Sequence, residues 1–253
     1  MTGDKFQNLY DIMIRLRKEC PWDREQTHDS IKGATLEETY EVLEAIDLKD
    51  YEELKAELGD LLLHIVFHSV IADENKNFNI NDVIDSISDK LIRRHPHVFG
   101  DTKVKDTKEI LKNWEEIKLS EGRDSVLEGV PKNLPSLARA YRLQEKASKV
   151  GFDWEKKEDV WKKVIEEIEE MHEQEREGTF EEFEKEMGDV FFALTNYARF
   201  LNVNPENALR RTNEKFISRF SYVEKKIKEL GKNLSDSTLE DMDKYWEESK
   251  KFD

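Results

Sequence analysis

Two sets of four carboxylates stand out in this sequence because both sets have the same spacing. The first set is Glu38, Glu41, Glu57 and Asp60, and the second is Glu167, Glu170, Glu186 and Asp189. Residues three apart on a helix share a face, so each set forms two acidic pairs. Two such pairs on facing helices repel each other unless a cation lies between them. Hard oxygen ligands select magnesium, manganese or calcium rather than zinc or copper, so the spacing predicts two divalent-metal sites.

A pair of cations follows each carboxylate set. Lys90 and Arg94, like Lys215 and Arg219, are four residues apart and share a helix face. An arginine can hold phosphate oxygens in a bidentate fork, and a lysine supplies a point charge. One such pair alone is more often a surface ion-pair partner, but its recurrence behind both sets favours phosphate. The sequence therefore predicts a metal-dependent site for a phosphorylated substrate.

Tryptophan and histidine offer further candidates. Trp114 and Trp246 occupy matching positions and could stack on a nucleobase, although a tryptophan near a helix end is more commonly a core anchor. His64 and His68 are four apart, a spacing that could hold a metal, but neither histidine recurs in the second half of the chain. We interpret these two histidines as residues of packing or local hydrogen bonding.

The carboxylate sets belong to an internal repeat. A shift of 129 residues, from 38 to 167, superposes the two sets without a gap, and Glu-x-Gly-Asp followed by apolar residues recurs in both copies. Small changes of offset further along indicate loops of different length. The stretch 121–135 contains two glycines and two prolines. We therefore predict an N-terminal domain over 1–125 and a C-terminal domain over 126–253, with a linker around 121–135.

The elements that position these side chains are helices. Apolar residues recur at helical spacing around each second acidic pair. They are Leu54, Leu58, Leu61, Leu62 and Ile65 in the first copy and Phe183, Met187, Val190, Phe191 and Leu194 in the second. Asn204 and Pro205 predict the start of the helix that carries the second cationic pair. We expect an all-α protein of two tandem, related helical-bundle domains, each a small antiparallel bundle.

Charge and composition exclude several classes of function. With 41 basic and 57 acidic residues the net charge is −16, which argues against stable nucleic acid binding and against an anionic membrane surface. The single Cys20 excludes an internal disulfide and a Cys-rich zinc site. No stretch approaches the roughly 20 apolar residues of a membrane-spanning helix. We expect a cytoplasmic protein without membrane association.

Several motifs together carry a resemblance to a known family. They are Cys20-Pro-Trp-Asp with Gln26-Thr-His, the two carboxylate sets, Gly129-Val-Pro with Leu134-Pro, Val150-Gly-Phe-Asp-Trp154, and Lys215-Phe with Arg219-Phe. On these motifs the chain resembles the MazG family along essentially its whole length, and is similar to the all-α NTP pyrophosphatase superfamily. The resemblance implies hydrolysis of ribo- or deoxynucleoside triphosphates to the monophosphate and pyrophosphate. It also implies Mg²⁺, for which Mn²⁺ could substitute, and a homodimer whose helices pack across subunits.

The family pattern also implies roles for individual residues. It makes the second carboxylate set metal ligands and Lys215 and Arg219 phosphate contacts, with Trp246 as a weaker transfer. Water activated by the metal would attack the α-phosphorus, with Glu38 or Glu167 as the proton acceptor. The first copy departs from the pattern in its cationic helix and has a longer loop. We therefore expect metal binding in both copies and catalysis chiefly in the second.

Two rival functions stay open at this point. A di-iron carboxylate bundle, an oxidoreductase or iron store, needs Glu-x-x-His on two helices. Glu169 with His172 and Glu25 with His28 have that spacing, but the repeat does not duplicate the motif. A non-enzymatic helical adaptor would use the acidic faces only to bind a partner. The sequence leaves open the base and sugar preference, the number of metal ions in each site and any regulatory partner.

Overall fold

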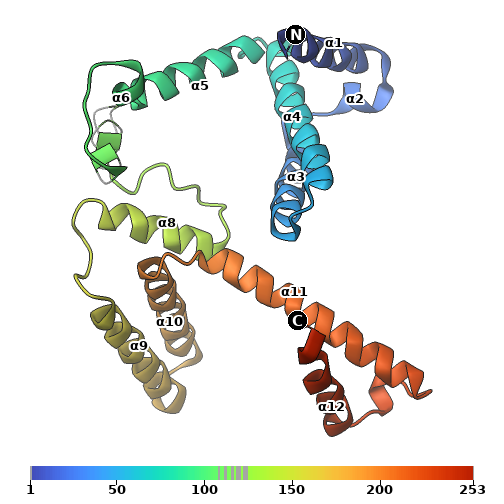
Figure 1. Cartoon of the computed structure of the whole chain (residues 1–253), viewed down its shortest axis with the longest axis vertical. Helices are drawn as coiled ribbons and strands as arrows, with labels where there is room; N and C mark the ends of the chain where they lie inside the picture. The colour runs from blue at the N-terminus through green and yellow to red at the C-terminus, as the bar shows by residue number, and fades with distance from the viewer. Residues whose placement is uncertain are drawn as a thin grey trace. The chain divides into compact units, whose positions relative to one another are not determined.

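The architecture is helical throughout the part of the chain that the computed structural model describes, residues 2–107, 109–110, 113–114, 117, 121 and 125–252. Every regular element there is an α-helix or a short 3-10 helix, so the prediction of an all-α protein is confirmed (Figure 1). No helix among these residues has the length and apolar content to cross a lipid bilayer.

The chain forms two compact units, as the tandem repeat predicts. Unit 1 is Met1–Lys105 and unit 2 is Asp106–Asp253. This division falls ahead of the domain limit at 125–126 that the repeat predicts, and residues 122–124 of the predicted linker lie outside the described residues. The repeat-based limit therefore stays a prediction.

Unit 1 is built on a hairpin of two long helices. Its helices are α1 (Thr2–Glu19), α2 (Pro21–Glu25), α3 (His28–Leu48), α4 (Tyr51–Glu74), α5 (Ile80–Arg94) and α6 (Pro96–Phe99). The chain reverses between α3 and α4 at Lys49, which has a left-handed φ of 57°. Asp50 then caps α4, because its carboxylate accepts hydrogen bonds from two backbone amides of the first turn. The short connection makes α3 and α4 antiparallel neighbours.

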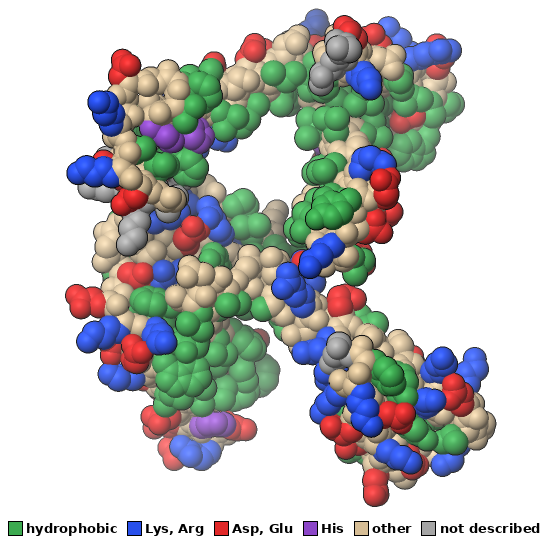
Figure 2. Space-filling model, in the orientation of Figure 1, with side chains coloured by type: hydrophobic (Ala, Val, Ile, Leu, Met, Phe, Trp, Pro, Cys, Tyr) green, Lys and Arg blue, Asp and Glu red, His purple; other side chains and the backbone are tan. Residues whose placement is uncertain are grey.

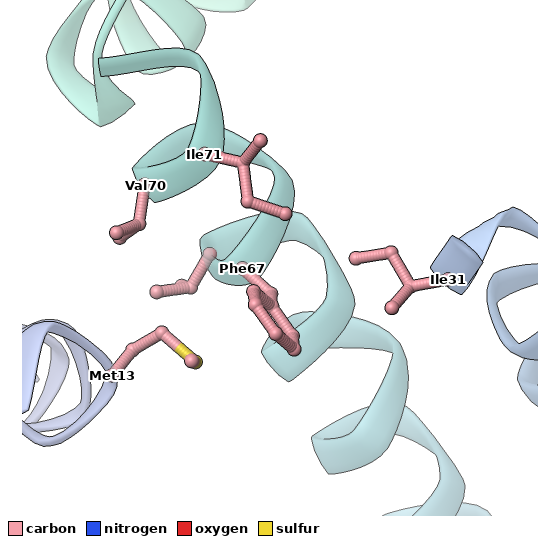
Figure 3. Packing of buried hydrophobic residues seen from close by; sticks show 6 residues of the cluster. Met13, Ile31, Phe67, Val70 and Ile71 are labelled. Atoms are coloured by element: carbon pink, nitrogen blue, oxygen red, sulfur yellow. The ribbon is translucent and has the colours of Figure 1, made fainter. Parts of the chain in front are cut away.

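The hydrophobic core of unit 1 lies at the open end of this hairpin. Figure 3 shows Met13 of α1, Ile31 of α3 and Phe67 of α4 converging on one cluster, and Met13 is only 1% exposed. Arg17 of α1 adds a polar clamp, because its Nε donates to Glu74 Oε1 at 3.0 Å. The core therefore fixes α1 against the hairpin and leaves the acidic pairs nearer the connecting turn.

Unit 2 repeats the hairpin. Its helices are α8 (Ser136–Ser148), α9 (Lys157–Glu177), α10 (Phe180–Phe200), α11 (Pro205–Glu229) and α12 (Leu239–Ser249), with 3-10 turns η1 (Leu234–Asp236) and η2 (Lys250–Phe252). Gly178 lies at the turn between α9 and α10, where a Cβ would be 2.9 Å from the Gln174 carbonyl oxygen. Thr179 then forms a capping box with Glu182. The predicted helix start at Asn204 is confirmed, because its side chain accepts from Asn207 N at 3.0 Å.

Candidate functional site

The hairpin of unit 1 brings three of its four predicted carboxylates together. Glu38 and Glu41 of α3 and Glu57 of α4 each offer an oxygen, and these oxygens lie within 4.8 Å of one another. We call these three residues the unit 1 cluster. Asp60 is outside the group, but its charge acts on it: burial, and then the charges of Asp60 and Glu41, raise the pKa of Glu38. Burial, followed by the charge of Glu41, raises the pKa of Glu57 to about 7.

Unit 2 brings together a similar but not identical set. Oxygens of Glu167 on α9 and of Glu186 and Asp189 on α10 lie within 4.8 Å of one another, and we call these residues the unit 2 cluster. Glu170 is the member left outside, although burial and then the charge of Glu167 raise its pKa. Both clusters have the composition of a site for a hard divalent cation, because each gathers oxygen ligands whose charges oppose one another.

Lys163 is a member of the unit 2 site that the sequence analysis missed. Its ammonium lies 2.6 Å from Glu166 Oε1 and 2.7 Å from Glu167 Oε1, and these carboxylates raise the pKa of the lysine. The corresponding position in the first copy is Ala34, so the search for repeated residues passed over it. In the sequence, the one indication that Lys163 belongs to this site is its four-residue spacing from Glu167, and that spacing is common on helix surfaces.

A cavity of about 390 Å³ opens beside the unit 2 cluster. Glu167 and Asp189 line it, and Phe152, Trp154 and Phe192 contribute apolar surface. Phe152 and Trp154 belong to the motif Val150-Gly-Phe-Asp-Trp154. This motif was the feature of the sequence that could have indicated a functional role for the two residues. The cavity therefore places flat, apolar surfaces next to the predicted metal ligands.

Fixed amide groups add polarity to this cavity. Gln144 Nε2 donates to the Phe192 carbonyl at 2.8 Å, which leaves Gln144 Oε1 buried without a hydrogen-bond partner. Asn196 Oδ1 accepts from Arg199 Nε at 2.9 Å, and Arg199 forms a two-point ion pair with Asp153. A ligand with apolar faces and polar edges, such as a nucleobase, matches this lining.

Unit 1 has a histidine at the repeat position of one residue that lines the unit 2 cavity. His64 stands at the repeat position of Ala193, and its Nδ1 lies 3.0 Å from Thr35 Oγ1. His68 Nε2 lies 3.0 Å from the same oxygen. The interpretation of these two histidines as locally hydrogen-bonded residues is therefore confirmed.

The cationic helices run away from the carboxylates. Figure 1 shows α11 diverging from the α9–α10 pair, so Lys215 and Arg219 do not line the cavity beside the unit 2 cluster. Arg219 instead lies over the ring of Trp246, 5.6 Å from its centroid, and Phe216 packs on the same ring. These contacts favour the core-anchor interpretation of Trp246.

The cationic helix of unit 1 is placed similarly. Lys90 lines a groove along α5 with Phe78 and Ile87. Figure 1 shows α5, which also carries Arg94, extending away from the α3–α4 pair that carries the unit 1 cluster. Trp114 is half-buried, but most of its neighbours in the chain lie outside the described residues. The phosphate and base-stacking roles of these residues stay predictions.

The contacts of His172, which forms a candidate di-iron motif with Glu169, count against the di-iron alternative. His172 Nδ1 lies 2.9 Å from Glu175 Oε2 on its own helix, and the side chain is more than half exposed. The imidazole of His172 therefore pairs with a residue of its own helix on the protein surface. His28, in the second candidate motif, lies 2.9 Å from His68.

Comparisons with known proteins agree with the internal repeat. The sequence model of the MazG nucleotide pyrophosphohydrolase domain matches twice, over residues 26–99 and 155–223. The chain is 44% identical over 254 residues to the nucleoside triphosphate pyrophosphohydrolase/pyrophosphatase MazG of Thermotoga maritima, covering 98% of this chain and 97% of the relative. It is 43% identical over 257 residues to the nucleoside triphosphate pyrophosphohydrolase of Escherichia coli K12, covering 98% of each. It is also 49% identical over 252 residues to the uncharacterized protein YabN of Bacillus subtilis, covering 97% of this chain and 52% of that protein. The chain therefore belongs to the MazG nucleotide pyrophosphohydrolase family.

Proposed function

We propose that this protein hydrolyses nucleoside triphosphates to the monophosphate and pyrophosphate, with Mg²⁺ held by the unit 2 cluster. The observation that carries the proposal is the position of Glu167, Glu186 and Asp189 beside the apolar cavity. The carboxylates suit a cation that binds phosphates, and the cavity suits a base. The names of the full-length relatives from Thermotoga maritima and Escherichia coli support the same reaction.

The residues of unit 2 fit magnesium. All three members of the cluster offer oxygen atoms, and Glu167 is only 8% exposed, so its charge is costly without a nearby cation. Bound there, Mg²⁺, or Mn²⁺ in its place, would supply Lewis acidity toward phosphate oxygens and lower the pKa of water. Lys163 already places one positive charge at the cluster and would turn to the triphosphate when the carboxylates bind metal.

The proton acceptor is best assigned to Glu170. The sequence analysis named Glu167 for this role, and Glu38 in unit 1, but Glu167 is a member of the cluster and pairs with Lys163. Glu170 stands outside the three-carboxylate group, but it lies three residues from Glu167 on the same helix face, so its carboxylate is near the cluster without being one of its ligands. It could take a proton from water that attacks the α-phosphorus, and pyrophosphate would leave.

We further propose that the active form is a homodimer. Figure 2 shows hydrophobic side chains gathered over α9 and α10, where Trp161 is 44% and Phe191 is 54% exposed. Helix α11 carries Lys215 and Arg219 and diverges from the α9–α10 pair in Figure 1, and neither residue lines the cavity beside the unit 2 cluster. A second copy would cover the apolar face, and Lys215 and Arg219 of the partner subunit would contact the phosphates.

A substrate panel tests this function. Canonical and damaged NTPs and dNTPs are incubated with Mg²⁺, and pyrophosphate is measured for the wild type beside Glu38→Gln and Glu167→Gln. We expect Glu167→Gln to lower the rate by about a hundredfold or more, as loss of a group that stabilises the transition state does, and Glu38→Gln to retain most of it. Release of orthophosphate alone, or full activity of Glu167→Gln, would contradict the proposal. An adaptor without enzymatic activity would release nothing from any nucleotide.

A further inference from the structure

The segment that leads into α8 contributes to the cavity beside the unit 2 cluster. Leu127 of this segment lines the cavity, although it lies in the predicted linker between the two repeats. Its side chain is 46% exposed, so it is not part of the buried core. A half-exposed leucine beside a cavity offers apolar surface to a ligand that enters. The chain between the repeats therefore supplies part of the unit 2 site.

A turn fixes the backbone on both sides of Leu127. The amide of Glu128 donates to the Ser125 carbonyl at 3.1 Å, which closes a turn over 125–128. Ser125 Oγ also accepts from the amide of Leu127 at 3.2 Å. Gly129 follows with a φ of 79°, in the left-handed region that glycine adopts without strain. Leu127 therefore holds a central position in an ordered turn.

Lys146 of α8 ties this turn to the rest of unit 2. Its side chain is only 3% exposed, although lysine is among the residues that are rarely buried. Its Nζ donates to the Val126 carbonyl at 3.0 Å and to the Glu128 carbonyl at 3.1 Å. These two carbonyls belong to the residues on either side of Leu127. Burial of a lysine head group is costly without acceptors, so the lysine and the turn stabilise each other.

This contact bears on the cavity through Leu127. Lys146 is not one of the described residues that line the cavity, whereas Leu143, Gln144 and Ala147 of the same helix are. We propose that Leu127 contacts the base of the nucleoside triphosphate, and that Lys146 is a positioning residue that holds Leu127 in place. The inference rests on the proposed function, because it assigns a further contact to the same substrate site. Removing the apolar face of a base from water beside Leu127 adds affinity, and the metal ligands are untouched.

Steady-state kinetics of the full-length protein with ATP and Mg²⁺ test this proposal. Leu127→Ala should raise KM about tenfold and keep kcat within about twofold, because only a binding contact is lost. Lys146→Met should raise KM to a similar extent, and Lys146→Arg should retain most of the affinity, because a guanidinium also donates to carbonyls. The matched controls are Leu230→Ala, at a leucine 56% exposed, and Lys149→Met, at a lysine whose Nζ lies 3.0 Å from Glu145 Oε1. Both controls should keep the KM of the wild type.

A double variant separates positioning from an independent structural role. Leu127→Ala together with Lys146→Met should raise KM no further than Leu127→Ala alone, because both substitutions remove the same contact. Additive increases in KM would overturn the positioning role of Lys146, and an unchanged KM in Leu127→Ala would overturn the contact. Circular dichroism checks folding, and the half-exposed position of Leu127 keeps Leu127→Ala informative even if Lys146→Met does not fold.

Hydrogen exchange distinguishes failure of this inference from failure of the proposed function. A non-hydrolysable ATP analogue with Mg²⁺ should slow amide exchange across 125–130 in the wild type, because a bound base restrains the turn. Protection of this segment without pyrophosphate release from ATP would contradict hydrolysis and leave the contact standing. Pyrophosphate release without protection would overturn the contact and leave hydrolysis standing. Absence of both would overturn both.

Discussion

Lowering the pH from 8 to 6 should weaken metal binding by unit 1 about tenfold, because Glu57 must lose a proton before it can act as a ligand. Burial beside Glu41 raises the pKa of this carboxyl to about 7. It is then ionised in about nine molecules of ten at pH 8 and in about one of ten at pH 6. The ratio of these fractions gives the expected change in the apparent dissociation constant.

The same pKa gives the sign of the effect on stability. The folded state without metal holds the proton of Glu57 more tightly than the unfolded chain does, because the ordinary pKa is 4.5. The contribution of this group to stability is fully present below pH 4.5 and is lost as the pH rises through about 7. A bound cation reverses the trend, because it favours the ionised carboxylate.

Calorimetry at the two pH values measures this competition. Mg²⁺ is titrated into protein carrying Glu186→Gln and Asp189→Asn, in two buffers of different ionisation enthalpy, so that released protons are counted. We expect about one proton per ion at pH 6 and close to none at pH 8. Glu57→Gln is the control and should bind more weakly, without this proton release. Equal affinity and no proton release at both pH values in the parent would refute the reasoning.

Three further predictions concern single positions. Asp189→Asn should lower pyrophosphate release by about a hundredfold while the matched Asp60→Asn retains it, and equal losses in rate assays would contradict catalysis in unit 2. Lys163→Met should raise the Mg²⁺ affinity of unit 2 several-fold in calorimetry, because the ammonium no longer pairs with Glu167. The same substitution should raise KM for the triphosphate, because one positive charge near the phosphates is lost. An unchanged Mg²⁺ affinity and an unchanged KM would show that the lysine plays no part. Met13→Ala, at a side chain 1% exposed, should reduce the free energy of unfolding by about 2–5 kcal/mol in urea, and a loss under about 1 kcal/mol would mean that the core of unit 1 refills the space.

The sequence alone determined the helical fold, the duplication and the candidate ligands. These features depend on local spacing: carboxylates three apart share a helix face wherever that helix packs, and Asn204 with Pro205 begins a helix without help from distant residues. The apolar residues beside each acidic pair likewise indicated that the two helices of each copy pack against one another. The resemblance to the MazG family, which the comparisons confirm, rested on the same motifs.

Only the tertiary structure decided which of these side chains meet. It placed Asp60 and Glu170 outside the two clusters and brought Lys163 to Glu167, since such contacts depend on side-chain conformations and on the packing of facing helices. Gln144 reaches the Phe192 carbonyl across 48 residues of sequence, and the Thr35 hydroxyl lies 3.0 Å from His64 Nδ1 across 29 residues. Spacing along the chain carries no information about such distances, because folding brings these atoms together through the packing of whole helices.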